Sequence, residues 1–319
     1  MTRSKDAGSV LGVNESVEVP AVLERVDFTQ WAGTVEATTQ QRALEALERG
    51  RVLVCPTLAF ALEPPEQQFL SPSCTDGSAK NISFDPQTGQ LRGSGCKGEQ
   101  QAALVAMLAR YATQALGLVQ RLLPGYQPAL QQARTSYRPV PAEGRVSSYK
   151  QDDRRLHIDA FPSRPTQGQR ILRVFTNVHP ASAPRVWQIG EPFEAFAAKF
   201  LPRVRPPWPG SAWFLRQLRI TRGRRTRYDH IMLALHDQAK GDADYQRTAP
   251  RLTVAFPPGS TWMAYTDVVL HAVQGGQYLF EQTFHLPVTA MREPDRSPLR
   301  MLEAMCRRPL IEGSATIPA

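Results

Sequence analysis

The chain has 319 residues, of which 42% are hydrophobic and 21% are charged, and its formal net charge at pH 7 is +9. These fractions are typical of a folded globular protein and exclude a disordered or fibrous chain. The positive charge indicates an acidic partner, which could be nucleic acid, anionic lipid or an anionic small substrate.

Residues 1–20 are polar and aperiodic, so we expect a loose N-terminal arm, and they lack the apolar core of a secretory signal. No stretch reaches the roughly 18 uninterrupted apolar residues that a membrane-spanning helix needs. The four cysteines are scattered without a C-x-x-C pair, which favours reduced structural thiols over a zinc site or a redox dithiol. We therefore expect a cytoplasmic protein.

Residues 21–130 have the pattern of a segment with helices and strands that precedes the β-rich part of the chain. A helix is predicted from a capping Thr39 to a glycine stop at Gly50. The run RVLVCPTLAF that follows predicts a β-strand ending at Pro56. This order indicates a protein with both helices and strands.

A long loop and a long helix come next. Residues 71–100 are rich in Gly, Ser, Asn and Asp, which favours a loop with one short strand at 82–84. Apolar residues then recur at helical spacing up to the Pro-Gly pair that follows Leu123. This spacing predicts a helix that packs on the protein core.

After Arg134 the pattern changes to short β-like runs separated by turn residues. The runs are TSYRPV, RVSSYK, RLHIDAF, RILRVFTNV, RLTVAF, STWMAYTDVVLHAV and QYLFEQTFHLPV. Such a series predicts a sandwich or barrel over residues 131–290. A basic insert at about 185–248, with helices expected at PFEAFAAKFL and YDHIMLALHDQAK, interrupts it. We expect a single domain over residues 21–319 that ends in a tail at 291–319.

The stretch RRLHIDAFPSRP contains the chain's single His-x-Asp pair. In an extended strand, His157 and Asp159 point to the same face and could both bind one metal ion. His271, between two later β-like runs, is the candidate third ligand. Two histidines and one carboxylate form the facial triad of non-haem iron(II) oxygenases. Each residue alone could be structural, for example Asp159 as a turn cap before Pro162, but the ordered set favours a metal site.

Three longer motifs carry a resemblance to a known family. They are KNISFDPQTGQLRG, LHIDAFPSRPTQGQRILRVFTNVHP and HAVQGGQYLFEQTFHLP. The order of the His-x-Asp strand and the distal histidine resembles that of the Fe(II) and 2-oxoglutarate dependent dioxygenases. The motifs themselves are similar to the bacterial hydroxylases of 3-deoxy-D-manno-oct-2-ulosonic acid (Kdo). The resemblance, from about Lys80 to Pro309, implies an α+β fold with a double-stranded β-helix core of the jelly-roll or cupin-like kind.

The resemblance also implies an activity. Kdo hydroxylases add a hydroxyl group at C3 of Kdo in the lipopolysaccharide inner core and form the 3-hydroxy sugar Ko. The expected cofactor is Fe(II), with 2-oxoglutarate and O2 as co-substrates and ascorbate as a stimulant. The expected partner is the anionic Kdo–lipid A glycolipid at the cytoplasmic face of the inner membrane, and no nucleic acid is expected. A 2-oxoglutarate oxygenase of another substrate and a non-catalytic basic module that binds anions or glycolipids remain alternatives.

The far carboxylate of 2-oxoglutarate needs a cation. Many enzymes of this fold carry one soon after the distal histidine, where this chain departs from the pattern with Gln277. Other branches supply it from the strand after His-x-Asp, which makes Arg173 the candidate anchor and Asn177, on the same strand face, a neutral helper. Arg170 is the nearest alternative, and Arg173 could instead lie on a solvated edge. Tyr149 is a candidate to hydrogen-bond the bound acid, or to pack.

The segment 201–227 has eight arginines and no acidic residue, with Trp208 and Trp213 interleaved. A solvated basic face or a nucleic-acid surface has a similar composition, but no recognised nucleic-acid module accompanies this one. The resemblance implies a glycolipid instead, because arginine forks match carboxylates and phosphates. The candidate substrate-binding residues are Arg222, Arg224 and Arg225.

Overall fold

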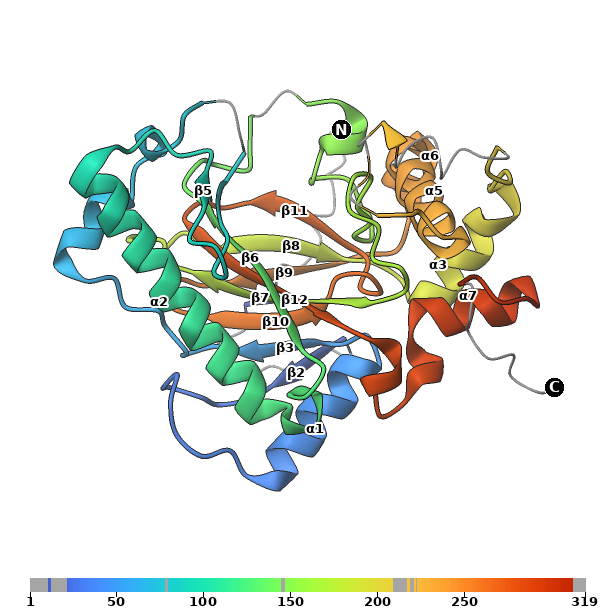
Figure 1. Ribbon diagram of the computed structural model, residues 1–319, viewed down its shortest axis with the longest axis horizontal. Coiled ribbons are helices and arrows are strands. Elements are labelled where there is room, and N and C mark those ends of the chain that lie inside the picture. Colours follow the sequence, from blue (N-terminus) through green and yellow to red (C-terminus); the bar gives the residue numbers. More distant parts are fainter. Residues whose placement is uncertain are drawn as a thin grey trace, which may run out of the picture.

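The computed structural model of the chain describes residues 11–12, 22–77, 80–144, 147–208, 217–218, 221 and 223–311. Two β-sheets form its centre, with helices on both sides (Figure 1). Within the described residues, the larger sheet has the strand order β2 (Leu23–Arg25), β3 (Val52–Cys55), β10 (Thr261–Tyr265), β7 (Arg170–Asn177), β12 (Leu279–Leu286), β6 (Gln131–Arg138), β4 (Ile82–Phe84) and β5 (Leu91–Arg92). The smaller sheet has the order β1 (Leu11–Gly12), β9 (Leu252–Phe256), β8 (Arg185–Ile189) and β11 (His271–Gly275).

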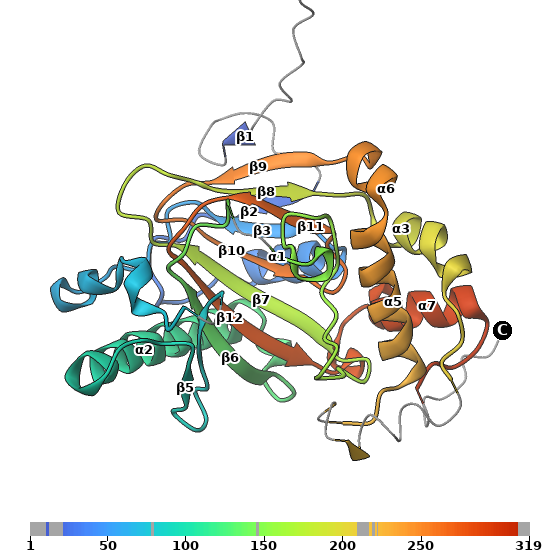
Figure 2. The same ribbon diagram turned by 90° about the horizontal axis from the view of Figure 1, so that it is seen from above.

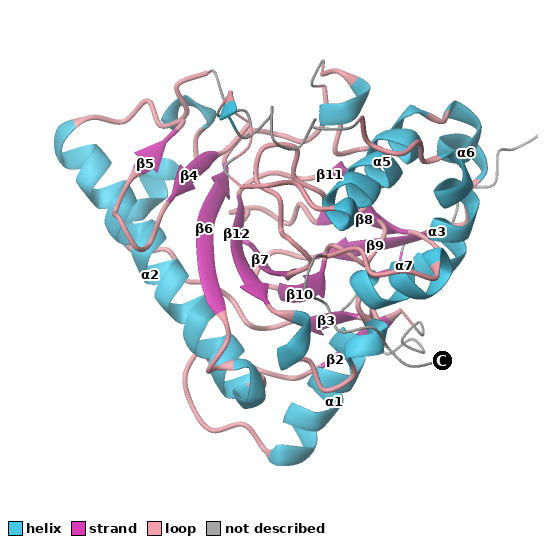
Figure 3. Ribbon diagram, turned by 45° about the vertical axis from the view of Figure 1, so that its right-hand side comes forward, coloured by secondary structure: helices cyan, strands magenta, loops and turns pink. Residues whose placement is uncertain are grey.

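The helices form two groups. The helices α1 (Ala37–Glu48) and α2 (Gly98–Leu122) pack on the larger sheet. The second group lies together on the opposite side of the strands (Figures 2 and 3) and consists of α3 (Phe193–Phe200), α5 (Arg227–Gly241), α6 (Ala243–Thr248) and α7 (Pro298–Cys306). Short 3-10 helices are η1 (Pro64–Phe69), η2 (Pro72–Cys74), η3 (Pro124–Tyr126), η4 (Tyr149–Gln151), η5 (Leu201–Arg203), η6 (Val288–Ala290) and η7 (Pro294–Arg296).

The sheets confirm the expected fold class. The chain passes from the larger sheet (β7) to the smaller (β8, β9), back to the larger (β10), then to β11 and β12 in turn. In the larger sheet β7 pairs antiparallel with both β10 and β12, and in the smaller sheet β8 pairs antiparallel with both β9 and β11. This alternation between two facing sheets is the double-stranded β-helix that the resemblance implied.

Helix α2 is the predicted core helix. Among the described residues it is the one helix long and apolar enough to cross a membrane, yet one of its faces is buried against the sheet. Its buried residues recur at three- and four-residue intervals and are Leu104, Met107, Leu108, Tyr111, Ala112, Ala115, Leu118, Val119 and Leu122. Such a stripe is typical of a helix that packs on a protein core.

Several predicted elements need correction. The described part of RVSSYK forms no strand, because Tyr149 and Lys150 belong to η4. The stretch 185–189, where we expected the insert to begin, is strand β8, so the helical insert starts after it. In the expected N-terminal arm, Leu11 and Gly12 form β1 and pair with β9. Helix α1 begins at Ala37, not after a capping Thr39, although Gly50 ends its C-terminal turn with a φ of +74°.

Aromatic side chains fill the space between the two sheets. Phe256 and Trp262 stack with ring centroids 4.0 Å apart, and Phe175 packs edge-on against Trp187 at 4.9 Å. Each such ring buries a large apolar area, so this cluster holds the two sheets at a fixed separation. Trp187 also stacks on the imidazole of His271 at 5.1 Å, which links the core to the predicted metal ligands.

Candidate metal centre

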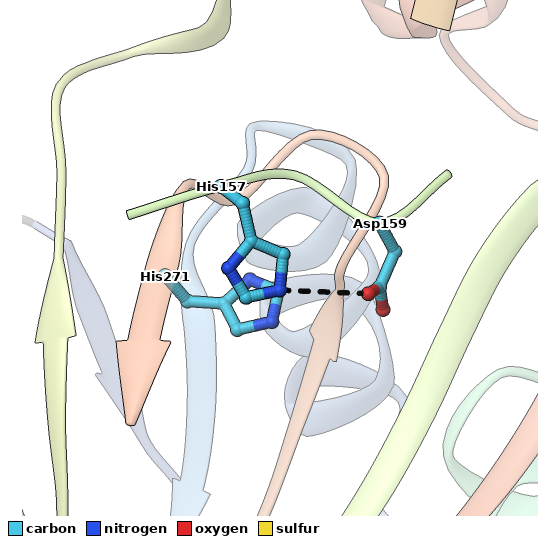
Figure 4. A group of neighbouring side chains, drawn as sticks. All are labelled: His157, Asp159 and His271. Atoms are coloured by element: carbon cyan, nitrogen blue, oxygen red, sulfur yellow. Dashed lines mark ion pairs between the residues drawn. The ribbon is translucent and has the colours of Figure 1, made fainter. Parts of the chain in front are cut away.

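The structure brings the three predicted metal ligands together. One ligand atom from each of His157, Asp159 and His271 lies within 4.8 Å of the other two (Figure 4). Both histidines are buried and Asp159 is half-buried. His157 and Asp159 come from the segment that precedes β7, and His271 is the first residue of β11. Residues far apart in the sequence therefore converge on one point between the two sheets.

Backbone pairing explains this convergence. The amide of His157 donates to His271 O (3.0 Å), and the amide of His271 donates back to His157 O (2.9 Å). Two residues further, the Asp159 amide donates to Thr266 O (2.8 Å). The His-x-Asp segment is thus fixed at two points but is not the regular strand that we predicted, since it forms an isolated bridge.

Both imidazoles have a defined orientation. Nδ1 of His157 lies 2.7 Å from Arg155 O, and Nδ1 of His271 lies 2.9 Å from Val269 O. A carbonyl oxygen can only accept, so each Nδ1 carries the proton and each Nε2 keeps a free lone pair. The Nε2 of His157 lies 3.9 Å from Oδ1 of Asp159. Protein histidines that bind metals commonly donate their other ring N–H in this way, which fixes the orientation of the ring.

The charge states also suit a divalent metal. Burial lowers the pKa of His157 well below its ordinary value, and the neighbouring His271 adds to this. Burial likewise lowers the pKa of His271. Burial opposes the charged form of Asp159, but the positive charge of Arg173 outweighs it and holds the pKa of that carboxyl below its usual range. At neutral pH the group therefore offers two neutral imidazoles and one carboxylate, the forms that bind metals.

Arg173, the predicted co-substrate anchor, lies next to this group. Its Nη2 is 3.1 Å from Oδ2 of Asp159, an ion pair without hydrogen-bond angles, and its Nη1 donates to Oε1 of Glu281 (2.6 Å). Arg138 donates to the other oxygen of Glu281 (2.9 Å). The Nε of Arg173 is buried and has no hydrogen-bond partner among the residues described. Arg173 is therefore an interior cation with one unused donor, not a residue on a solvated edge.

The other two predicted co-substrate residues are placed differently. Asn177 is buried at the end of β7, where its side-chain amide donates to Ala183 O (3.2 Å) and Phe256 O (3.0 Å). Both amide protons are thus used on backbone groups, which argues against the helper role. Tyr149 is 43% exposed on η4, and its ring packs against Gly241, so the structure does not bring it to the metal ligands.

Arg170, the alternative co-substrate anchor, and the arginines of the basic insert lie in different parts of the structure. Arg170 is fully buried in an ion pair with Asp267 (2.7 Å), a structural role. Arg225 donates to Pro162 O (2.7 Å), in the loop that follows Asp159. Arg224 is exposed. Arg222 and Trp213 lie outside the described residues.

A charged pocket beside the candidate metal ligands was not predicted. Four cations and two carboxylates contribute to its lining, namely Lys80, Arg138, Arg154, Arg185, Asp152 and Asp153. It adjoins the metal ligands because the amide of Val273, two residues beyond His271 and also in the lining, donates to Asp153 O (2.8 Å). No local pattern marks these residues in the sequence, since they come from segments that only the fold brings together.

Arg185 is the most unusual member of this pocket. It is 3% exposed, makes no ion pair within the described part of the chain, and donates Nη1 to Gly276 O (2.8 Å). Burial, followed by the neighbouring cation Arg138, lowers the pKa of Arg185 to about 9. A buried cation without a paired carboxylate is costly unless an anion compensates it. The pocket is therefore suited to bind an anionic ligand.

Comparisons with known proteins agree with this chemistry. A family model described as 3-deoxy-D-manno-oct-2-ulosonic acid (Kdo) hydroxylase matches residues 30–309. No match was found among curated proteins. Among solved structures, the chain is similar to the Kdo hydroxylase KdoO, a non-heme Fe(II) alphaketoglutarate dependent dioxygenase, in its complex with cobalt(II). The two chains are 44% identical, the match covers 93% of this chain and 100% of that one, and the TM-score is 0.90.

Two further KdoO structures match equally well. One is the complex with alphaketoglutarate, which is 2-oxoglutarate, and Fe(III), with 44% identity, 93% and 99% of the two chains covered and a TM-score of 0.89. The other is the complex with succinate and Fe(III), with 44% identity, 93% and 100% covered and a TM-score of 0.89.

Proposed function

This chain belongs to the Kdo hydroxylase family, and we propose that it adds a hydroxyl group at C3 of Kdo carried on an anionic Kdo–lipid A glycolipid, giving Ko. It is an Fe(II) and 2-oxoglutarate dependent dioxygenase. The observation that carries the proposal is the convergence of His157, Asp159 and His271 beside a pocket rich in cations.

We assign the metal to these three residues. The Nε2 lone pairs of His157 and His271 and the Asp159 carboxylate would bind one face of Fe(II), which leaves positions for co-substrate and O2. With both bound, the metal centre supplies the oxidation, in which 2-oxoglutarate, O2 and a substrate C–H become succinate, CO2 and a C–OH group. The protein fixes the ligands through the His157–His271 backbone pair and excludes water by burying both rings.

Arg173 remains our candidate for the far carboxylate of 2-oxoglutarate. Its free Nε lies in the interior, close to the metal ligand Asp159. Glu281 pairs with both Arg138 and Arg173, and Asp159 also lies 3.1 Å from Arg173, so the guanidinium is held in place by two carboxylates. A carboxylate bound at Arg173 would use the donor that these two leave free.

The pocket lined by Arg138 and Arg185 would take the sugar carboxylate of Kdo. Arg185 offers a buried cation without an ion pair, and its Nε, like that of Arg138, lacks a hydrogen-bond partner in the described residues. Arginine matches a carboxylate with two parallel donors, which fixes the orientation of the sugar as well as its position.

The lipid part of the substrate would lie along the basic insert. Arg225 binds the loop that follows Asp159, so the insert reaches the vicinity of the metal ligands. Trp208 is 85% exposed within a run that also contains Arg203 and Arg205. Exposed tryptophan beside arginine suits the interface of an anionic membrane. We therefore propose a peripheral contact with the cytoplasmic face of the inner membrane.

The test of the activity follows oxygen into the sugar. Protein purified without O2 is mixed with Fe(II), 2-oxoglutarate, ascorbate and a Kdo–lipid A precursor, and labelled O2 is then admitted. We expect one labelled oxygen atom on Kdo for each succinate formed, as read by mass spectrometry. Succinate without sugar oxidation would refute Kdo as the substrate, while the His271→Ala variant serves as the control for background oxidation.

The test of the lipid partner compares two substrates and two vesicle compositions. We expect kcat/KM to be higher for Kdo–lipid A than for free Kdo, and sedimentation with anionic vesicles but not with neutral ones. A Trp208→Ser variant with Arg224→Gln and Arg225→Gln should weaken both effects. Equal use of free Kdo and no vesicle binding would refute the glycolipid and membrane assignments while leaving the hydroxylation intact.

A further inference from the structure

Within the described part of the chain, the segment that carries His157 has a strand neighbour on one side only. On one side it pairs with His271, as described above. On the other side, the side chain of Gln246 from α6 takes the place of a strand. Its Oε1 accepts from the amide of Leu156 (2.8 Å), and its Nε2 donates to Leu156 O (2.9 Å). One side chain thus satisfies both backbone groups of Leu156, which a paired strand would otherwise do.

These two bonds act on the peptide groups on either side of Leu156. In the first, Arg155 O accepts from Nδ1 of His157, while the Leu156 amide at the other end donates to Gln246. In the second, the His157 amide donates to His271 O, while Leu156 O accepts from Gln246. Because a peptide group is planar and rigid, fixing one end of it fixes the orientation of the other.

Gln246 is itself held firmly by the helical insert. Its Nε2 also donates to Ala239 O (2.9 Å), near the end of α5. The same part of α5 is tied to the segment before His157, because Arg155 donates to Lys240 O (2.7 Å) and Lys240 donates to Lys150 O (3.0 Å). Through Gln246, the backbone next to His157 is therefore held in a fixed position relative to α5 and α6.

We infer that Gln246 is a positioning residue for the metal centre, which sets the direction of the His157 imidazole through the two peptide groups next to Leu156. This inference rests on the proposed metal site. Gln246 bonds the backbone of Leu156, the residue before His157. It would not itself touch the metal, the co-substrate or the substrate. Loss of a partner bonded directly to a metal-binding histidine commonly costs roughly 10–100-fold in metal affinity or activity, and Gln246 acts one bond further from the ring, so a smaller effect is expected.

The experiment measures Co(II) binding in the full chain. Gln246→Met keeps the length of the side chain but removes both hydrogen-bonding groups, and Gln246→Glu keeps the acceptor but loses the donor. Gln40→Met is the matched control, because the Gln40 amide, also partly buried, donates to Arg121 O (2.8 Å) between α1 and α2. Affinity and the visible absorption band of bound Co(II) are recorded beside a thermal melt of each metal-free protein.

We expect Gln246→Met to bind Co(II) up to about 10-fold more weakly than the unchanged chain, the lower end of the range for a direct partner of a ligand, with an altered absorption band. Gln246→Glu should fall between them, which keeps the inference testable if the methionine variant does not fold. Gln40→Met should bind Co(II) normally even if its melting temperature falls, since a purely structural loss does not change the ligand geometry.

Two results would overturn the inference in distinguishable ways. If the unchanged chain binds Co(II) and both Gln246 variants match its affinity and its absorption band, Gln246 has no positioning role and the metal site stands. If the unchanged chain binds no Co(II), the proposed metal site fails, and the inference fails with it.

Discussion

His157 and His271 donate their backbone amides to each other's carbonyl oxygens, at 3.0 and 2.9 Å, although they lie at opposite ends of the β-rich half of the chain. Their imidazoles are thereby placed side by side, with ring centroids 4.6 Å apart. The pair is made by the main chain, so it does not depend on the identity of either side chain. A substitution of either histidine can therefore remove a candidate ligand nitrogen while leaving the backbone pairing in place.

We expect His271→Ala to lose metal binding while keeping the fold. The alanine retains the backbone pair with His157 but removes one ligand nitrogen, so Co(II) affinity should fall by roughly 100-fold or more, beyond the effect of losing an outer partner. A Co(II) titration and a thermal melt measure the two properties. His230→Ala is the control, because the His230 ring contacts only Arg205 O (2.8 Å) in the hydrogen bonds described. Unchanged affinity in His271→Ala would exclude this residue as a ligand.

Arg173→Leu should raise the KM for 2-oxoglutarate. A hydrogen bond to a charged group contributes about 1.5–3 kcal/mol, which corresponds to roughly 10–100-fold in KM. Initial rates of succinate formation measure it, with Arg134→Leu on strand β6 of the same sheet as the control for loss of an arginine. A normal KM in Arg173→Leu together with a raised KM in Arg185→Leu would move the anchor to Arg185.

Asn177→Ala should lower stability and leave co-substrate binding unchanged. It removes the donors to Ala183 O and Phe256 O in a buried position, and each unsatisfied buried group costs about 1–3 kcal/mol. Urea denaturation should show a loss of about 2–4 kcal/mol in the free energy of unfolding. The helper role that strand spacing suggested would be restored if the variant were stable but bound 2-oxoglutarate weakly.

Arg170→Met should be among the most destabilising single changes in the chain. It leaves Asp267, which is 1% exposed, buried without its partner, and breaking a buried ion pair costs about 3–5 kcal/mol. The double variant Arg170→Met with Asp267→Leu should recover much of this loss, because no buried charge remains. If the double variant is no more stable than the single one by urea denaturation, the cost does not come from the unpaired carboxylate.

The candidate metal ligands could be predicted from the sequence, but their surroundings could not. The His-x-Asp spacing and the position of His271 were enough to propose the group, because ligand types and their spacing are read directly from the sequence, even though the segment is not the regular strand we assumed. Likewise, the short strand at 82–84 and the apolar stripe of α2 were visible as local patterns. These features follow from neighbours in the chain.

What could not be predicted depends on distant contacts. Strand β8 is short and lies among turn residues, and it is a strand because β9 and β11 flank it on both sides. Arg173 and Asn177 do lie on one strand, but Asn177 sits where β7 ends and its amide serves the adjacent backbone. The cations of the charged pocket and the contact of Gln246 with Leu156 arise only when separate segments meet in space.

The connection between β8 and β9 has a consequence for how this enzyme could diversify. The two strands pair directly, Val186 with Ala255 and Trp187 with Val254, so the helices between them are in topological terms an enlarged hairpin loop. The entropy of closing a loop rises only slowly with its length, so the length of this connection could change at little cost as long as the core contacts of Phe196, Phe200 and Leu235 are replaced. Replacing this connection by that of another family member would change the surface that the basic insert now forms. The replacement would need a glutamine or asparagine side chain that bonds the backbone of Leu156 as Gln246 does now.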